Sequence, residues 1–296
     1  MSETSPDDLV AAFQTEGEPV RGRLARLGPA VNEILRAHDY PEPVANLLGE
    51  ACALAALVGS NLKFEGRLLV EARGSGPVSF VIADYDTTGA LRGYCRFNPE
   101  AVEKASTGFL RPGARTLLGD GVFTMTIDPG EEMNRYQGMT DIQGETLALC
   151  AEQYFAQSEQ TPTRIRLAVG HEAGAWRAGG LLIQCIAADD ARGSTIEAWE
   201  RTQMLFETIG EDELVDADVS SNRLLWRLFH EDGVRVFSDK PLRAFCRCNL
   251  ERIEAVLKSF DPAEREDMVE PDGKIHVTCE YCSKVYAVAP ETLQTA

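Results

Sequence analysis

Two closely spaced cysteine pairs near the end of the chain, Cys246-Arg247-Cys248 and Cys279-Glu280-Tyr281-Cys282, decide how the sequence is interpreted. An acidic segment with helical patterning separates them and is long enough to fold back. Thiolates are soft ligands, and four of them at such spacing are what a tetrahedral zinc site requires. We therefore predict one zinc ion per chain, held by Cys246, Cys248, Cys279 and Cys282.

Such a zinc site has two possible roles, and the spacing alone leaves both open. It could be a static knuckle that stabilises a small C-terminal module, because structural zinc sites in small peptides supply roughly 10–16 kcal/mol. It could also be a redox switch, because zinc keeps the sulfurs as thiolates, the form that oxidants attack. His276 precedes the second pair, but four cysteines already complete the shell, so we do not expect it as a ligand.

The other cysteines and the start of the chain indicate a reducing compartment. Four cysteines stand singly within apolar patterns and are expected to be small buried hydrophobes: Cys52, Cys95, Cys150 and Cys185. The acidic N-terminus lacks the features of a secretory signal. The longest apolar run, residues 51–58, is far shorter than the roughly 20 residues that cross a bilayer, so it predicts a buried helix. We expect a cytoplasmic protein with no membrane partner.

The charge of the chain argues against polyanionic partners. Its formal net charge is −18 and its pI is about 4.7. Nucleic acids and anionic lipids carry the same sign and attract basic surfaces. We therefore expect no nucleic-acid binding, although a zinc ribbon that binds nucleic acid is one alternative for the cysteine quartet.

Residues 1–192 are predicted to form an N-terminal α+β domain, an antiparallel sheet with packed helices. Alternating patterns and Gly-rich turns predict the strands, and 3.6-residue apolar stripes predict two helices after Pro29 and a third from near Glu145. Residues 136–139 are expected to be a loop. The expected strands are 19–27, 67–71, 78–83, 91–95, 122–127, 164–169 and 181–186.

The character of the chain changes after Gly193, where we predict a helical connecting segment, which we call the linker. Between Thr195 and Ser220 the net charge is −7, yet large apolar side chains and two of the three tryptophans lie in the linker. Such a segment is either only a solvated face or a set of amphipathic helices that becomes a soluble, sticky chain when released. The large apolar side chains of this segment include Trp199, Met204, Leu205, Phe206, Leu224, Leu225, Trp226 and Phe229.

No catalytic signature accompanies these features. The sequence has no Gly-x-Ser-x-Gly elbow, phosphate-binding loop or His-Glu-x-x-His helix, and it departs from the zinc-deaminase pattern. A thiol–disulfide oxidoreductase that uses Cys279-x-x-Cys282 is the enzymatic alternative. The βαβ pattern that normally surrounds such a motif is missing, so we expect no enzyme.

The order of several motifs resembles the heat shock protein 33 family of redox-regulated holdase chaperones. The resemblance spans nearly the whole chain and ends on the cysteine quartet. It rests on the following stretches: His38-Asp39-Tyr40-Pro41-Glu42-Pro43-Val44, Leu47-Leu48-Gly49-Glu50, Tyr136-Gln137-Gly138-Met139, Gln143-Gly144-Glu145-Thr146-Leu147-Ala148, Tyr154-Phe155, Ser158-Glu159-Gln160-x-Pro162-Thr163-Arg164, Gly179-Gly180-Leu181-Leu182-Ile183-Gln184 and Leu228-Phe229-His230-Glu231.

The resemblance implies three parts: the N-terminal domain, a metastable linker at 193–245 and a redox-switch zinc module at 246–296. It also implies that oxidation forms two disulfides, Cys246–Cys248 and Cys279–Cys282, after which zinc leaves and the linker unfolds. The activated protein, commonly a homodimer, would then bind unfolding client proteins without ATP. The candidate client-binding side chains would be the large apolar ones of the linker: Trp199, Met204, Leu205, Phe206, Leu224, Leu225, Trp226 and Phe229.

Overall fold

The computed structural model describes residues 7–16, 20–109, 111–130, 134–186 and 195–293. The chain divides into two compact units, Met1–Ala244 and Phe245–Ala296. The division at residue 245 lies next to the predicted start of the zinc module. The predicted boundary between the N-terminal domain and the linker, at 192/193, lies outside the described residues and stays a prediction.

The first sheet of the larger unit is antiparallel at every described pair. Its strand order is β10-β1-β2-β9-β8, and β11 also pairs with β1. Successive side chains along β9 point to opposite faces, so both of its faces can be buried. The strands are β1 (Leu9–Thr15), β2 (Val20–Leu27), β8 (Thr163–Glu172), β9 (Ala175–Cys185), β10 (Val234–Val236) and β11 (Lys240–Pro241).

The second sheet has the order β12-β5-β4-β3-β6-β7, and only the short pair of β12 with β5 is parallel. The meander β3-β4-β5 that the Gly-rich turns predicted is confirmed. The strands are β3 (Arg67–Gly74), β4 (Val78–Asp86), β5 (Ala90–Phe97), β6 (Gly121–Asp128), β7 (Tyr136–Asp141) and β12 (Arg243–Ala244).

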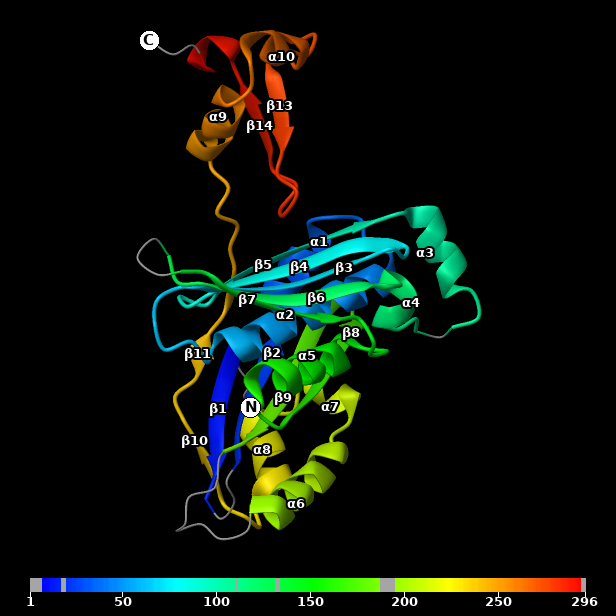
Figure 1. Cartoon of the computed structure of the whole chain (residues 1–296), viewed down its shortest axis with the longest axis vertical. Helices are drawn as coiled ribbons and strands as arrows, with labels where there is room; N and C mark the ends of the chain where they lie inside the picture. The colour runs from blue at the N-terminus through cyan, green and yellow to red at the C-terminus, as the bar shows by residue number, and fades with distance from the viewer. Residues whose placement is uncertain (1–6, 17–19, 110, 131–133, 187–194, 294–296) are drawn as a thin grey trace. The chain divides into compact units, whose positions relative to one another are not determined.

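The helix α2 (Glu42–Gly59) is the centre of the main core. It contacts strands of both sheets, and residues such as Leu48, Leu54 and Leu57 are completely buried there. Among the described helices, α2 is the one whose length and composition would suit a membrane span, but 78% of that window is buried inside the protein. It is therefore the buried core helix that the apolar run predicted (Figure 1).

Smaller helices complete this core. Thr146 accepts a hydrogen bond from the backbone N–H of Leu149 and so fixes the start of α5, close to the predicted start at Glu145. Asn98 caps α3 in the same way. The elements are α1 (Pro29–Arg36), α3 (Pro99–Ser106), α4 (Ala114–Leu118), α5 (Leu147–Tyr154) and the π-helical turn η1 (Phe155–Glu159).

The helices of the predicted linker cover the other face of the first sheet (Figure 1). Their apolar side chains form a second core with β1, β2, β8 and β9, in which Phe229 stacks on Phe13 at a centroid distance of 5.4 Å. The sheet side of this core is supplied by Phe13, Val20, Leu24, Ala168, Leu181 and Ile183. The helices are α6 (Thr195–Glu207), α7 (Glu211–Val215) and α8 (Ser221–Phe229).

Three parts of the structure differ from the sequence-based expectation. The expected loop at 136–139 is wrong, because these residues form the edge strand β7, paired with β6. Strand β1 was not predicted, since its apolar residues face a core on both sides and do not alternate with polar ones. The linker is helical only as far as Phe229, and the residues after it form β10, β11 and β12.

The smaller unit consists of two helices and a β-hairpin. Its core contains four fully buried apolar side chains, from Leu257, Ile275, Val288 and Leu293. A core of this size cannot offset the entropy of ordering some fifty residues, so such modules normally depend on a metal or a disulfide. The elements are α9 (Leu250–Lys258), α10 (Pro262–Asp267), β13 (Ile275–Thr278), β14 (Val285–Val288) and the 3₁₀ turn η2 (Pro290–Leu293).

Candidate metal centre

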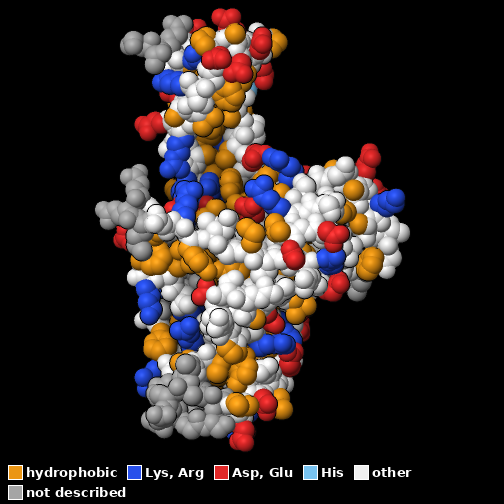
Figure 2. All heavy atoms as spheres, in the orientation of Figure 1, with side chains coloured by type: hydrophobic (Ala, Val, Ile, Leu, Met, Phe, Trp, Pro, Cys, Tyr) orange, Lys and Arg blue, Asp and Glu red, His pale blue; other side chains and the backbone are white. Residues whose placement is uncertain are grey.

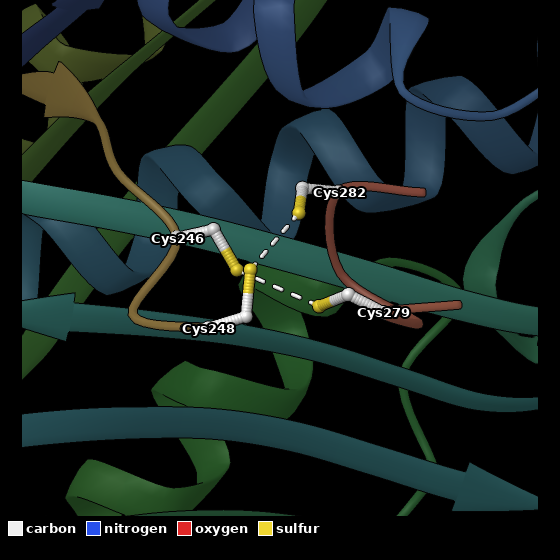
Figure 3. Close-up of side chains that lie close together, drawn as sticks. All are labelled: Cys246, Cys248, Cys279 and Cys282. Atoms are coloured by element: carbon white, nitrogen blue, oxygen red, sulfur yellow. Dashed lines mark hydrogen bonds between the residues drawn. The ribbon is translucent and has the colours of Figure 1, made fainter. Parts of the chain in front are cut away.

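The four predicted ligands converge within the smaller unit (Figure 3). Cys246 and Cys248 lie in the irregular segment before α9, and Cys279 and Cys282 lie in the turn between β13 and β14. All four sulfur atoms lie within 4.8 Å of one another. Two segments about thirty residues apart in sequence therefore build one site.

The spacing of the sulfurs fits zinc. Four sulfurs at about 2.3 Å from a central ion would lie about 3.8 Å apart at the corners of a tetrahedron. The Sγ atoms of Cys246 and Cys279 are 3.7 Å apart, and those of Cys248 and Cys282 are 3.4 Å apart. None of the four cysteines forms a disulfide in this structure.

The hairpin turn fixes the second pair. The N–H of Cys279 donates to the carbonyl of Lys284 at 3.0 Å, and the N–H of Ser283 donates to the carbonyl of Cys279 at 2.9 Å. Ser283 adopts a φ of 56°, which turns the chain sharply back into β14. The N–H of Lys284 also donates to the sulfur of Cys282, and such contacts favour a thiolate.

The sulfurs differ in their own surroundings. Burial raises the pKa of Cys246, and it raises that of Cys282 to about 12. Burial also acts to raise the pKa of Cys248, but hydrogen bonds from the Tyr286 hydroxyl, at 3.1 Å, and from neighbouring thiols lower it to about 7. Cys248 thus carries negative charge more readily than Cys246 or Cys282. Sequence reasoning missed Tyr286, because its contact with Cys248 depends on the pairing of β13 with β14.

The structure places the remaining candidates away from this centre. The Nε2 atom of His276 lies 2.9 Å from a carboxylate oxygen of Asp272, outside the sulfur quartet, as the sequence predicted. Cys52, Cys95 and Cys150 are buried in the larger unit and Cys185 is half-buried. Burial raises the pKa of the Cys52 thiol to about 12, which makes it a poor nucleophile and a packing residue.

The eight candidate client-binding side chains fall into two groups. Phe206, Leu224, Leu225 and Phe229 are buried against the first sheet, and Trp199 and Leu205 are partly buried there. Met204 and Trp226 are 70% and 61% exposed. Most of the apolar surface that could bind an unfolding chain is therefore covered by the sheet in this state.

The enzymatic alternative finds no support in the surroundings of Cys279 and Cys282. The pair lies on a hairpin turn, and no helix begins at it among the described residues of the smaller unit. A redox-catalytic Cys-x-x-Cys pair is normally activated at a helix N-terminus within a βαβ unit. This pair is built as half of a metal site.

Comparisons with known proteins agree with this geometry. The model of the family described as Hsp33 protein matches residues 8–289. A 33 kDa chaperonin of Caulobacter vibrioides (strain NA1000 / CB15N) is 67% identical over 288 residues, covering 96% of this chain and 95% of the relative. A 33 kDa chaperonin of Azotobacter vinelandii is 40% identical, covering 94% of this chain and 91% of the relative.

A solved structure has the same fold. The crystal structure of the 33 kDa chaperonin (heat shock protein 33 homolog) from Thermotoga maritima superposes with a TM-score of 0.81 at 24% identity and covers 97% of this chain and 96% of that one. The four-cysteine centre, the fold and the sequence matches lead to one conclusion: this chain belongs to the Hsp33 family.

Proposed function

We propose that this protein is a redox-regulated, ATP-independent holdase that binds unfolding proteins after oxidation of its cysteine quartet. The observation that carries the proposal is the quartet itself, four thiols at zinc-binding distances in a unit with a very small core. The linker helices add to it, because they keep large apolar side chains hidden against a sheet.

In the reduced state the quartet is proposed to hold one zinc ion, through Cys246, Cys248, Cys279 and Cys282. Bound zinc supplies a tetrahedral charge centre that keeps the four sulfurs as thiolates. The Tyr286 hydroxyl and the backbone N–H of Lys284 orient two of these sulfurs. The linker then stays folded on the first sheet.

Oxidation is proposed to join Cys246 to Cys248 and Cys279 to Cys282. In each pair two thiolates lose two electrons and form one S–S bond, while one hydrogen peroxide takes up the two electrons and two protons and becomes two water molecules. A sulfur within a disulfide no longer offers a thiolate ligand, so the smaller unit loses its main source of stability.

Linker release is the proposed functional consequence. Unfolding of the smaller unit removes the anchor that follows residue 244, and the linker leaves the sheet with its apolar side chains. Client contact is assigned to Trp199, Met204, Leu205, Phe206, Leu224, Leu225, Trp226 and Phe229, and to the sheet face that they cover. The strong negative charge of the chain keeps complexes with clients soluble. The active form is proposed to be a homodimer, and the protein to act in the cytoplasm.

Zinc quantification paired with a client-aggregation assay tests this function. Hydrogen peroxide or hypochlorite should release about one zinc per chain, and the treated protein should suppress aggregation of a heat-denaturing client. The reduced protein should suppress it weakly. Zinc release with no gain in suppression would contradict the chaperone function while leaving the metal site intact. Turnover of a disulfide substrate by the reduced protein would instead favour the oxidoreductase.

A further inference from the structure

The sheet face under the linker has a basic border as well as an apolar centre. Arg26 shares its face with Leu24 on β2, and Arg166 lies opposite Leu181 on the neighbouring strand. Three more arginines, Arg111, Arg164 and Arg177, contact the linker. Where α7 lies, Figure 2 shows Lys or Arg side chains next to Asp or Glu side chains. We refer to Arg26, Arg111, Arg164, Arg166 and Arg177 as the arginine border.

One end of the border holds an aromatic residue followed by an acid. Phe206 is 1% exposed, and the guanidinium of Arg166 lies 5.5 Å from its ring centroid. The carboxylate of Glu207 accepts hydrogen bonds from Arg166 at 2.6 Å and from Arg164 at 2.5 Å. Arg166 also donates to the carbonyl of Ile209 at 2.5 Å. Cation–π and charged hydrogen bonds thus act on adjacent linker residues.

The other end holds the carbonyl groups at the C-terminus of α7. Arg177 donates to the carbonyl of Val215 at 2.6 Å, and Arg26 donates to the carbonyls of Glu213 and Asp216. The last carbonyls of a helix lack partners within the helix and carry partial negative charge. Arg26 and Arg177 therefore bind the end of a helix through its backbone carbonyls, so this contact does not depend on the side chains of the helix.

Arg26 and Arg166 find their acceptors in the linker among the described contacts. The other three arginines also have partners outside it: Arg177 pairs with Asp7, Arg111 donates to the carbonyl of Val169, and Arg164 lies 3.5 Å from Glu152. Arg26 is 1% exposed, and within the described residues both of its hydrogen bonds end on linker carbonyls. When the linker leaves, its guanidinium and those of Arg164 and Arg166 lose these acceptors beside an apolar surface. A segment that supplies carboxylates, carbonyls and one large aromatic side chain can replace the linker there.

We propose that the arginine border and its apolar centre form a docking site for client segments that are acidic, carry an aromatic side chain and can form a helix. In this structure, linker residues 206–216 occupy this site in place of a client segment. This inference rests on the proposed holdase function and names the class of client segment that the sheet selects. The linker and such clients compete for one site. Selection acts locally, because charge effects beyond about 8–10 Å are screened at physiological salt.

Peptide binding to the oxidised full-length protein tests the proposal. One labelled peptide carries residues 204–218, and a matched peptide carries the same sequence with every Asp and Glu replaced by Asn and Gln. The acidic peptide should bind about tenfold or more tightly, as expected for charged hydrogen bonds. Arg166→Gln should lower its affinity about tenfold, whereas Arg73→Gln, at an exposed arginine of the second sheet, should not change it.

The outcomes separate this inference from the proposed function. If the oxidised wild-type protein suppresses client aggregation but binds both peptides equally, the docking site is overturned and the holdase function stands. If the same sample suppresses no aggregation, the holdase function fails and the docking site fails with it. Since the two peptides are compared on the wild-type protein, a folding defect of Arg166→Gln cannot hide the result.

Discussion

Replacing one buried aromatic residue should release the linker without any oxidant. Phe229 is completely buried between α8 and the first sheet, where it stacks on Phe13. Truncation of a buried phenylalanine to alanine costs about 3–5 kcal/mol. If α8 opens locally, Phe229→Ala should raise the population of the open linker about a hundredfold to several thousandfold, at about 1.4 kcal/mol per factor of ten.

Hydrogen exchange of the reduced, zinc-loaded protein measures this effect directly. The backbone amides of α8 should exchange faster in Phe229→Ala, while those of the central helix α2 should keep their protection. Trp226→Ala is the matched control, since this residue lies on the same helix but is 61% exposed. Its substitution should change stability by no more than about 0.5 kcal/mol.

Function should follow the same difference. Reduced Phe229→Ala should suppress client aggregation without oxidant, whereas reduced Trp226→Ala should still need oxidation. Two results would refute the reasoning. Unchanged protection of α8 in Phe229→Ala would mean that the sheet does not hold the linker. Equal loss of protection in α2 and α8 would mean that the linker does not open as a separate segment.

Three further perturbations address the metal centre, the core helix and the helix–sheet contact. Cys279→Ser should lower zinc content and make the linker sensitive to protease, whereas Cys185→Ser should do neither; equal zinc content in both would contradict the ligand assignment. Burial raises the pKa of Glu50 to about 7 from its usual value of about 4.5, so its contribution to stability is complete below pH 4.5 and is lost as pH rises through about 7. The urea midpoint of unfolding should therefore fall between pH 5 and pH 8, and Glu50→Gln should remove the part of this fall that comes from ionisation of Glu50. An identical fall in both proteins would show that Glu50 does not contribute to it. A Cβ added at Gly179 would lie 2.2 Å from the carbonyl oxygen of Leu214, so Gly179→Ala should weaken the packing of α7 on the first sheet by about 1–3 kcal/mol. The variant should then need a lower oxidant concentration for activation. Activation at the wild-type oxidant concentration would argue against this contact.

The cysteine centre could be predicted from sequence because its ligands come in two local pairs. The distance between Cys246 and Cys248, or between Cys279 and Cys282, is set mostly by the spacing within the pair, so the ligand set needs little knowledge of the fold. The contribution of Tyr286 could not be predicted in the same way. It depends on the register of the β13–β14 hairpin, in which Tyr286 lies opposite Val277.

The docking of the linker could be predicted only in part. The apolar stripes and the charge of −7 were compatible with amphipathic helices, but the alternation of apolar and charged residues at 19–27 predicted a strand without a partner for its arginines. Arg26 is buried instead, because helices almost two hundred residues later in the chain cover it. Such long-range pairing leaves no local signal. The acidic excess of the linker was compatible with a basic counterpart elsewhere in the chain, but equally with a solvated face.

The end of the linker explains how a small metal centre can control a much larger surface. Beyond α8 the chain is held to the sheets by β10, β11 and β12, which are only two or three residues long. Such short ladders contribute few hydrogen bonds, and β12 ends at Ala244, two residues before the first cysteine. If the smaller unit unfolds, fraying can therefore begin at the edge strands and proceed back to α8. The energetic cost of release then falls mainly on the apolar contacts of the helices and on the arginine border, which are the same contacts that a client segment can replace.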